Sequence, residues 1–220
     1  MIIIATQRRG SEFFVNICLF GATGRVGSII LDHILNTHYP VRVLVRDSKK
    51  LNRISTNLTI IEGDVLTAED VVTCINGTDV VISALNTDGF STISKSMPII
   101  IKTMKEQGIK RIITIGTAGI LQSRTEPCLY RFQSSESKRT TTRDAEDHLQ
   151  AYLLLKESGL DWTIVCPTYL PVGERIGVYR YEKDILPINA TSISVYDTGD
   201  FAYQQLFTNE FIGFRVGLTY

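Results

Sequence analysis

Residues 21–27 read Gly21-Ala22-Thr23-Gly24-Arg25-Val26-Gly27 and lie between two different hydrophobic patterns. Residues 15–20 before them form a mostly apolar run that is typical of a buried strand, and the apolar residues after them recur at helical spacing. Because glycine has no Cβ, the backbone of such a turn can approach a diphosphate, and the free N–H groups that open the helix point at the anion. The stretch therefore predicts a strand, a phosphate-binding turn and a helix.

Each glycine of this turn has its own expected role. Gly21 makes the sharp turn, Gly24 admits the diphosphate, and Gly27 lets the helix pack closely on the strand. The spacing is G-x-x-G-x-x-G and not the common G-x-G-x-x-G, so an ordinary glycine-rich loop is the alternative. The flanking strand and helix favour the phosphate site, and we expect the cofactor to contact Gly21, Ala22, Thr23, Gly24, Arg25, Val26 and Gly27.

Segments with strand composition alternate with helical segments along the rest of the chain. The expected strands are 41–45, 58–61, 79–82, 111–115, 161–165 (broken by Pro167) and 214–218, and the expected helices begin near 67 and cover 97–107, 141–158 and 197–207. This alternation predicts a Rossmann-type, doubly wound parallel α/β sheet with helices on both faces. At 220 residues we expect a single domain over 15–220, preceded by an extension, residues 1–14, that is disordered or forms an edge.

Composition excludes several classes of partner. Lysine plus arginine equals aspartate plus glutamate, at 23 each, so nucleic acid and anionic membranes are not expected to bind. The apolar run at residues 1–5 is too short to cross a bilayer. The four cysteines show no C-x-x-C spacing, which indicates a reducing, cytoplasmic protein without a metal site. We expect a monomer or small homo-oligomer that binds a small-molecule substrate.

The tip of the second strand decides between the two nicotinamide dinucleotides. In a doubly wound sheet the ligand lies across the carboxyl ends of the strands, so residue 46 faces the adenosine ribose. Arg46, followed by Lys50, can grip a 2′-phosphate, and Arg25 would add to the same positive pocket. Asp47 could instead reach a free ribose hydroxyl. We expect NADP, with NAD as the less favoured alternative.

Other strand ends offer contacts along the rest of the dinucleotide. Asp64 and the Val65 amide fit the adenine, Ala84, Leu85 and Asn86 follow the fourth strand along the ribose, and Pro167 and Thr168 fit the carboxamide. Position along the sheet is the basis for these assignments, and a plain turn is the alternative at 64–65 and at 84–86.

Taken together, these motifs resemble those of atypical short-chain dehydrogenases/reductases, of the flavin reductase (biliverdin-IXβ reductase) and NmrA-like group. The resemblance runs from about residue 15 to the C-terminus and rests on residues 21–27, 43–48, 62–65, 77–82 and 157–165 before Pro167. It implies that Arg46 binds the 2′-phosphate, that Thr117 matches a catalytic-region serine, and that Tyr169 matches an active-site histidine. Cys166-Pro167 stands where many members have Arg-Pro.

The sequence also contains a Tyr-x-x-x-Lys pair, Tyr152 and Lys156, which many short-chain dehydrogenases use for proton transfer. Lys156 would lie about 20 Å along its helix from the cofactor edge, so we expect Tyr152 to pack on the sheet instead. The remaining catalytic candidates are Thr117, Tyr169 and His148, although a surface position is the commoner outcome for His148.

These residues favour an NADPH-dependent oxidoreductase that transfers hydride to a small aromatic or carbonyl acceptor, such as a flavin or quinone. Segments 117–138 and 168–194 would form the substrate mouth. An NADP-binding sensor without turnover is the alternative, because no strong acid is evident. A nucleotide-sugar epimerase or dehydratase is a weaker one, because the C-terminal segment is short.

Overall fold

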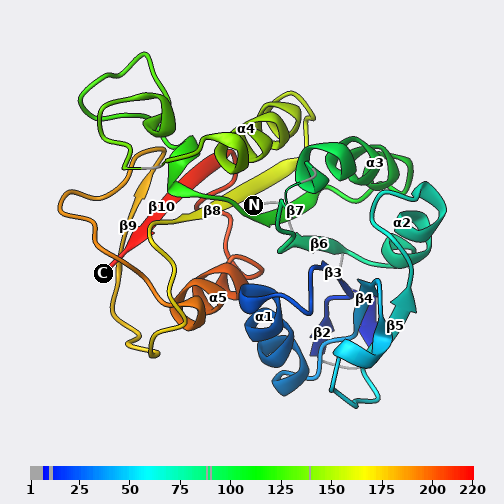
Figure 1. Ribbon diagram of the computed structural model, residues 1–220. Coiled ribbons are helices and arrows are strands. Elements are labelled where there is room, and N and C mark those ends of the chain that lie inside the picture. The colour runs from blue at the N-terminus through cyan, green and yellow to red at the C-terminus, as the bar shows by residue number, and fades with distance from the viewer. Residues whose placement is uncertain (1–6, 10–11, 88, 90, 139) are drawn as a thin grey trace.

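A computed structural model describes residues 7–9, 12–87, 89, 91–138 and 140–220 (Figure 1). Its larger sheet contains β3 (Ile17–Phe20), β4 (Val41–Val45), β5 (Leu58–Glu62), β6 (Val80–Ser83), β7 (Arg111–Ile115), β8 (Asp161–Pro167), β9 (Arg180–Lys183) and β10 (Phe214–Thr219). The helices are α1 (Arg25–Asn36), α2 (Ala68–Ile75), α3 (Thr92–Glu106), α4 (Arg143–Lys156) and α5 (Val195–Gln204). Short 3-10 turns occur at η1 (Ser48–Lys50), η2 (Ala118–Ile120) and η3 (Arg131–Gln133).

The eight strands are ordered β5-β4-β3-β6-β7-β8-β10-β9, and all neighbours are parallel except β9 and β10. Figure 1 shows α1 and α5 side by side on one face of the sheet and α2, α3 and α4 on the other. Each face has its own buried apolar cluster, because central strands such as β3 are buried on both sides. The predicted fold class is confirmed.

Three details differ from expectation. The expected strand 161–165 extends two residues further, and β8 ends at Pro167; beyond Val165 only β10 pairs with β8, and proline is tolerated at such one-sided positions. α3 contains nearly all of 97–107, which was expected to be the bulk of a helix, and begins earlier, at Thr92. β9 was not expected at all, because its sequence Arg-Tyr-Glu-Lys lacks an apolar alternation and its pairing with β10 is a long-range contact.

The amino-terminal extension contains β1 (Gln7–Arg9) and β2 (Glu12–Phe14), which pair antiparallel in a two-stranded sheet of their own. In this described part the extension adds no edge strand to the main sheet. Residues 1–6 and 10–11 of the expected extension lie outside the described residues. Within the described ranges, none of the helices has the length and hydrophobicity needed to cross a membrane.

Candidate functional site

The glycine-rich turn is packed so closely that two of its positions accept no side chain. Gly21 has a φ of +80°, and a Cβ there would lie 2.4 Å from the Ala84 carbonyl oxygen. A Cβ on Gly27 would lie 2.0 Å from the carbonyl oxygen of Gly21. The predicted turn at Gly21 and the close helix packing at Gly27 are therefore confirmed.

Gly24 is the N-cap of α1, and its role differs from that of the other two glycines. A Cβ there would come no closer than 3.2 Å to the Gly21 carbonyl oxygen. As a glycine it offers no side-chain acceptor to the first amides of α1, and the first helical turn has no acidic residue. A helix start without a capping side chain fits an anionic ligand.

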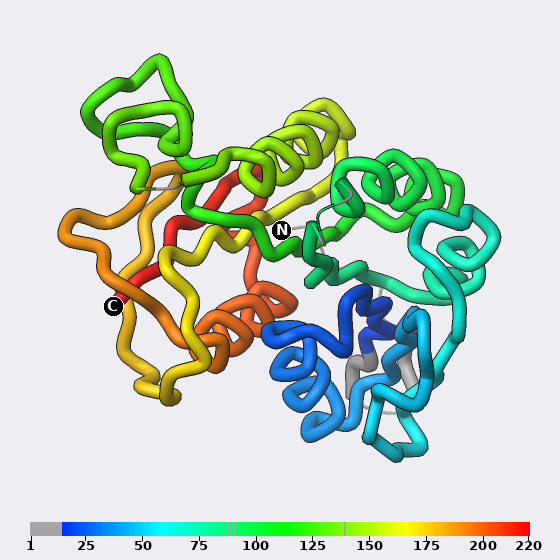
Figure 2. Tube along the Cα trace, in the orientation of Figure 1, coloured from blue at the N-terminus to red at the C-terminus, as the bar shows by residue number. Residues whose placement is uncertain are grey.

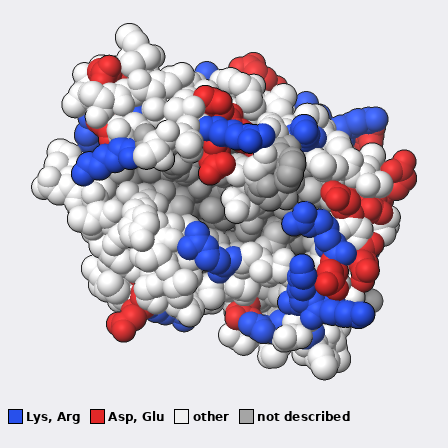
Figure 3. Space-filling view, viewed as in Figure 1, with Lys and Arg blue, Asp and Glu red and all other residues white. Residues whose placement is uncertain are grey.

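A cleft of about 370 Å³ opens beside this turn. Figure 3 shows this face hollowed near its centre, with Lys and Arg side chains gathered over the region of β4 and the turn after it. Nine predicted residues line the cleft: Gly21, Thr23, Gly24, Arg46, Asp64, Val65, Ala84, Leu85 and Asn86. They come from the carboxyl ends of β3, β4, β5 and β6, where a doubly wound sheet binds its ligand.

Five further residues line the cleft without having been predicted: Leu44, Val45, Gly63, Leu66 and Thr92. All but Thr92 adjoin predicted positions at the ends of β4 and β5, so a wider window around each strand end would have found them. Thr92 opens α3, and the first amides of that helix are capped by a distant residue, Asp147 of α4. The Asp147 carboxylate accepts hydrogen bonds from the amides of Ile93 and Ser94, at 3.3 and 2.9 Å.

Several predicted cofactor contacts lie outside the cleft lining. Ala22 and Val26 are buried behind the turn, together with Gly27. Lys50 is exposed in η1, and Arg25 donates to the backbone oxygen of Leu170 at 2.8 Å. Pro167 and Thr168 lie at the end of β8, where the Thr168 amide donates to Leu218.

The two charged residues that follow β4, Arg46 and Asp47, make different contacts. Asp47 caps η1, with its Oδ1 accepting from the Lys49 amide at 3.0 Å. Its carboxylate is thereby engaged in its own turn, whereas the exposed Arg46 lines the cleft. At the next strand end, Asp64 accepts from the Leu66 amide at 2.9 Å and its own amide donates to Asp70 at 2.8 Å. Short local turns thus shape this half of the cleft.

The three catalytic candidates lie apart from the cleft lining. Thr117 caps η2, with its hydroxyl oxygen 3.3 Å from the Gly119 amide. Tyr169 is 72% exposed just beyond β8, and His148 is half-buried on α4.

Cys166, which replaces the arginine common in the resembled group, is fully buried. Burial raises the pKa of its thiol to about 12, although Arg215 and a hydrogen bond from the Thr117 amide act in the opposite direction. It is therefore a packing residue within β8, where it lies opposite Gly217 of β10. Cys18, Cys74 and Cys128 are free thiols as well.

Tyr152 is a core residue, as expected. It is only 7% exposed, its ring packs edge-on against Trp162 at 5.7 Å, and the Arg215 guanidinium lies 4.5 Å from the ring centre. Burial raises the pKa of its phenol. This burial agrees with the expectation that Tyr152 packs on the sheet.

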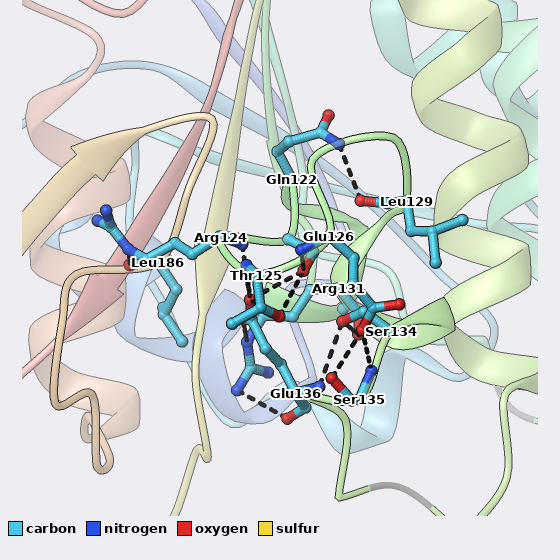
Figure 4. A network of polar contacts seen from close by, with 12 residues as sticks. Gln122, Arg124, Thr125, Glu126, Leu129, Arg131, Ser134, Ser135, Glu136 and Leu186 are labelled. Carbon is cyan, nitrogen blue, oxygen red and sulfur yellow. Dashed lines mark hydrogen bonds and ion pairs between the residues drawn. The ribbon is translucent and has the colours of Figure 1, made fainter.

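The segment 117–138 is ordered by two glutamates (Figure 4). Glu136 accepts from the amides of Arg124 and Thr125 at 2.6 and 2.9 Å and from the Ser123 hydroxyl at 2.8 Å. Burial alone would raise the pKa of Glu136, but these hydrogen bonds outweigh it and lower that pKa. Glu126 binds the amide and hydroxyl of Ser135, which lowers its pKa as well.

The two segments expected at the substrate mouth lie side by side (Figure 2). Arg124 donates to the Leu186 carbonyl oxygen at 2.9 Å and pairs with Glu182 of β9. The Gln122 amide donates to the Asp184 carbonyl oxygen at 2.8 Å.

The fold and the cleft define a Rossmann-type protein with a dinucleotide-binding turn. Comparison with known families agrees, because the NAD(P)H-binding family matches residues 21–209. The chain therefore belongs to the NAD(P)H-binding family.

Solved structures of similar proteins cover nearly the whole chain. A candidate epimerase from Bacteroides thetaiotaomicron is 30% identical, with a TM-score of 0.83 over 94% of this chain and 97% of its own. A candidate NADH-flavin reductase from Streptococcus pneumoniae TIGR4 is 23% identical, with a TM-score of 0.77 over 93% and 99%. A short-chain dehydrogenase/reductase from Veillonella parvula DSM 2008 in complex with NADP is 17% identical, with a TM-score of 0.79 over 94% and 95%. The last two are less than 25% identical and show likeness of fold, and the family match confirms the NAD(P)-binding part of the expected resemblance.

Proposed function

We propose that the protein is an NADPH-dependent oxidoreductase that transfers hydride to a small aromatic or carbonyl acceptor, such as a flavin or quinone. The observation that carries the proposal is the cleft itself, which joins an uncapped helix start at Gly24 to an exposed arginine at the β4 tip. Membership of the NAD(P)H-binding family and the flavin reductase neighbour support it.

The residues of the cleft fit a dinucleotide. Gly21 and Gly27 bring the turn close to β6, and Gly24 leaves room beside the first amides of α1 for a diphosphate. Asp64 and Val65 would contact the adenine, and Ala84, Leu85 and Asn86 would pass along the ribose. The bound dinucleotide would supply the hydride, and the chain would supply binding and orientation.

The β4 tip favours NADP over NAD. Arg46 would grip the 2′-phosphate by paired, charge-assisted hydrogen bonds. NAD selection would need a carboxylate that accepts from the 2′-hydroxyl, whereas Asp47 holds its Oδ1 on the Lys49 amide and is not among the residues that line the cleft. The NADP complex of the Veillonella neighbour is compatible with this choice.

The acceptor would bind beyond the nicotinamide, at the ends of β7 and β8. Thr117 would donate a hydrogen bond to an acceptor carbonyl, Tyr169 would cover the nicotinamide or donate a proton, and Pro167 and Thr168 would hold the carboxamide. Hydride transfer to a flavin or quinone needs mainly close placement of donor and acceptor, so no strong acid is required.

A sensor that binds NADP without turnover is the second candidate, favoured by the burial of Tyr152, which keeps the Tyr152/Lys156 pair from acting as the proton donor. An epimerase, suggested by the Bacteroides neighbour, would need such a donor.

The test is NADPH oxidation with a panel of flavins, quinones and carbonyl compounds. Oxidation with one class supports the reductase, whereas tight NADPH binding without oxidation of any supports the sensor.

A further inference from the structure

The side chain of Arg25 links two parts of the carboxyl edge. Arg25 is the first residue of α1, directly after the glycine-rich turn, and its Nη1 donates to the Leu170 carbonyl oxygen at 2.8 Å. Leu170 lies just beyond β8, next to Thr168 and Tyr169. One hydrogen bond therefore connects the start of α1 to the segment expected at the nicotinamide.

The sheet order places Arg46 and β8 on opposite sides of β3, the strand that leads to Arg25. β4, which carries Arg46 at its tip, is next to β3 on one side, whereas β8 is separated from β3 by β6 and β7 on the other. Neighbouring strands lie about 4.8 Å apart, so β4 and β8 are separated by about 19 Å across the sheet. While its guanidinium is held on Leu170, Arg25 serves the half of the edge away from Arg46.

The same segment is anchored a second time, on α5. The buried Asp197 carboxylate accepts from the amides of Ile176 and Gly177 at 2.9 and 3.0 Å, and the Ile193 amide donates to the Tyr169 carbonyl oxygen at 2.9 Å. Asp197 is fully buried, whereas Arg25 is exposed. The hydrogen bond from Arg25 to Leu170 can therefore be removed by substitution without exposing a buried residue.

We propose that Arg25 is a positioning residue for the nicotinamide half of the site: it holds Leu170, and with it Thr168 and Tyr169, beside the glycine-rich turn, and it takes no part in a 2′-phosphate pocket. The term nicotinamide half rests on the proposed function, whereas the hold on residues 168–170 does not. Because a single donor makes the contact, a lysine at this position retains it.

The first experiment measures amide hydrogen exchange in the full-length protein without dinucleotide. Arg25→Gln is expected to speed exchange in peptides covering residues 168–178 by about twofold to tenfold, the effect of losing one hydrogen bond. Arg25→Lys is expected to restore most of the protection. Arg53→Gln is the control, because Arg53 is an exposed arginine bound to Asp32, a residue of α1, the helix that Arg25 begins. Unchanged exchange in Arg25→Gln would overturn the proposal.

The second experiment compares dissociation constants for NADPH and NADH. Arg25→Gln is expected to leave their ratio within about twofold of wild type, whereas Arg46→Gln lowers the preference for NADPH by about tenfold or more. An equal loss of preference in both variants would place Arg25 on the 2′-phosphate and refute the assignment. If the wild-type protein binds neither dinucleotide, the proposed function fails, and the exchange experiment decides the role of Arg25 by itself.

Discussion

The two halves of the carboxyl edge are built in different ways. At the ends of β4 and β5, local turns shape the cleft, with Asp47 bound to the Lys49 amide and Asp64 to the Leu66 amide. At the ends of β7 and β8, distant segments hold one another, as Arg124 holds the Leu186 carbonyl oxygen. The difference shows that the β4 and β5 end of the cleft depends on short-range turns, whereas the acceptor half depends on side chains far apart in the chain.

The largest effect is expected in the local half, from Gly27→Ala. The new Cβ would meet the Gly21 carbonyl oxygen at 2.0 Å, so the helix must shift, at a cost of about 3 kcal/mol in the free energy of unfolding. Urea unfolding and an NADPH titration measure both consequences. Ser28→Ala, one residue further along α1, is the matched control and should change neither. Wild-type stability in Gly27→Ala would contradict the packing role of Gly27.

Arg46→Gln is expected to have the next largest effect, and it tests whether the β4 tip selects the 2′-phosphate of NADPH. Loss of charge-assisted hydrogen bonds should weaken NADPH binding by about tenfold to a hundredfold and leave NADH binding nearly unchanged. Fluorescence titration with both dinucleotides measures the two constants. Asp47→Asn, which keeps a capping side chain on η1, is the control. A parallel loss of NADH affinity in Arg46→Gln would show that Arg46 does not read the 2′-phosphate.

Glu136→Ala tests the long-range half. Removing this acceptor leaves the amides of Arg124 and Thr125 and the Ser123 hydroxyl without their partner, which should cost about 2 kcal/mol locally and speed proteolysis within residues 117–138. Glu106→Gln, an exposed glutamate in α3, is the control. NADPH affinity should change little, because the loop lies outside the cleft lining; a large loss would show that the two halves are coupled.

The same glutamate gives the loop a pH dependence. Because the folded-state pKa of Glu136 is lowered, its stabilisation is complete above the ordinary glutamate pKa of 4.5 and is lost as the pH falls through the lower folded-state pKa. Hydrogen exchange of residues 117–138 should therefore accelerate relative to the core only below pH 4.5. Acceleration already at neutral pH would exclude Glu136 as its source.

The smallest effect is expected from Tyr152→Phe. Its ring contacts with Trp162 and Arg215 persist in phenylalanine, so stability and NADPH oxidation should stay close to those of the wild type. Tyr169→Phe provides the comparison, because it removes the hydroxyl proposed near the acceptor. A large loss of turnover in Tyr152→Phe, with the fold intact, would restore the Tyr-x-x-x-Lys pair as a catalytic element.

The sequence predicts the parts of this molecule that depend on near neighbours. β7 is found with its full bounds, and the turn at Gly21 follows from glycine chemistry and from the strand before it. Nine residues expected at strand ends line one cleft, because parallel strands present their carboxyl ends at one edge.

The remaining features depend on contacts that no local pattern records. β9 is a strand because β10 pairs with it, and Tyr181 and its neighbours in β9 are mostly exposed. α3 starts at Thr92 because a carboxylate from α4 caps it, while Ser91 before it has a left-handed φ of 61°. A cysteine in a predicted strand is expected to behave as a small apolar residue, but no local pattern places the Cys166 thiol against the Thr117 amide.

The capping of α3 by Asp147 has a consequence for the order in which the molecule is made. Asp147 follows Ile93, whose amide it binds, by 54 positions in the sequence. During synthesis the glycine-rich turn and the start of α3 therefore emerge well before the carboxylate that caps α3. A nascent chain that has released only β3 to β7 would hold the glycine-rich turn beside an unfinished pocket. Capture of a dinucleotide during synthesis would then have to wait for the emergence of α4.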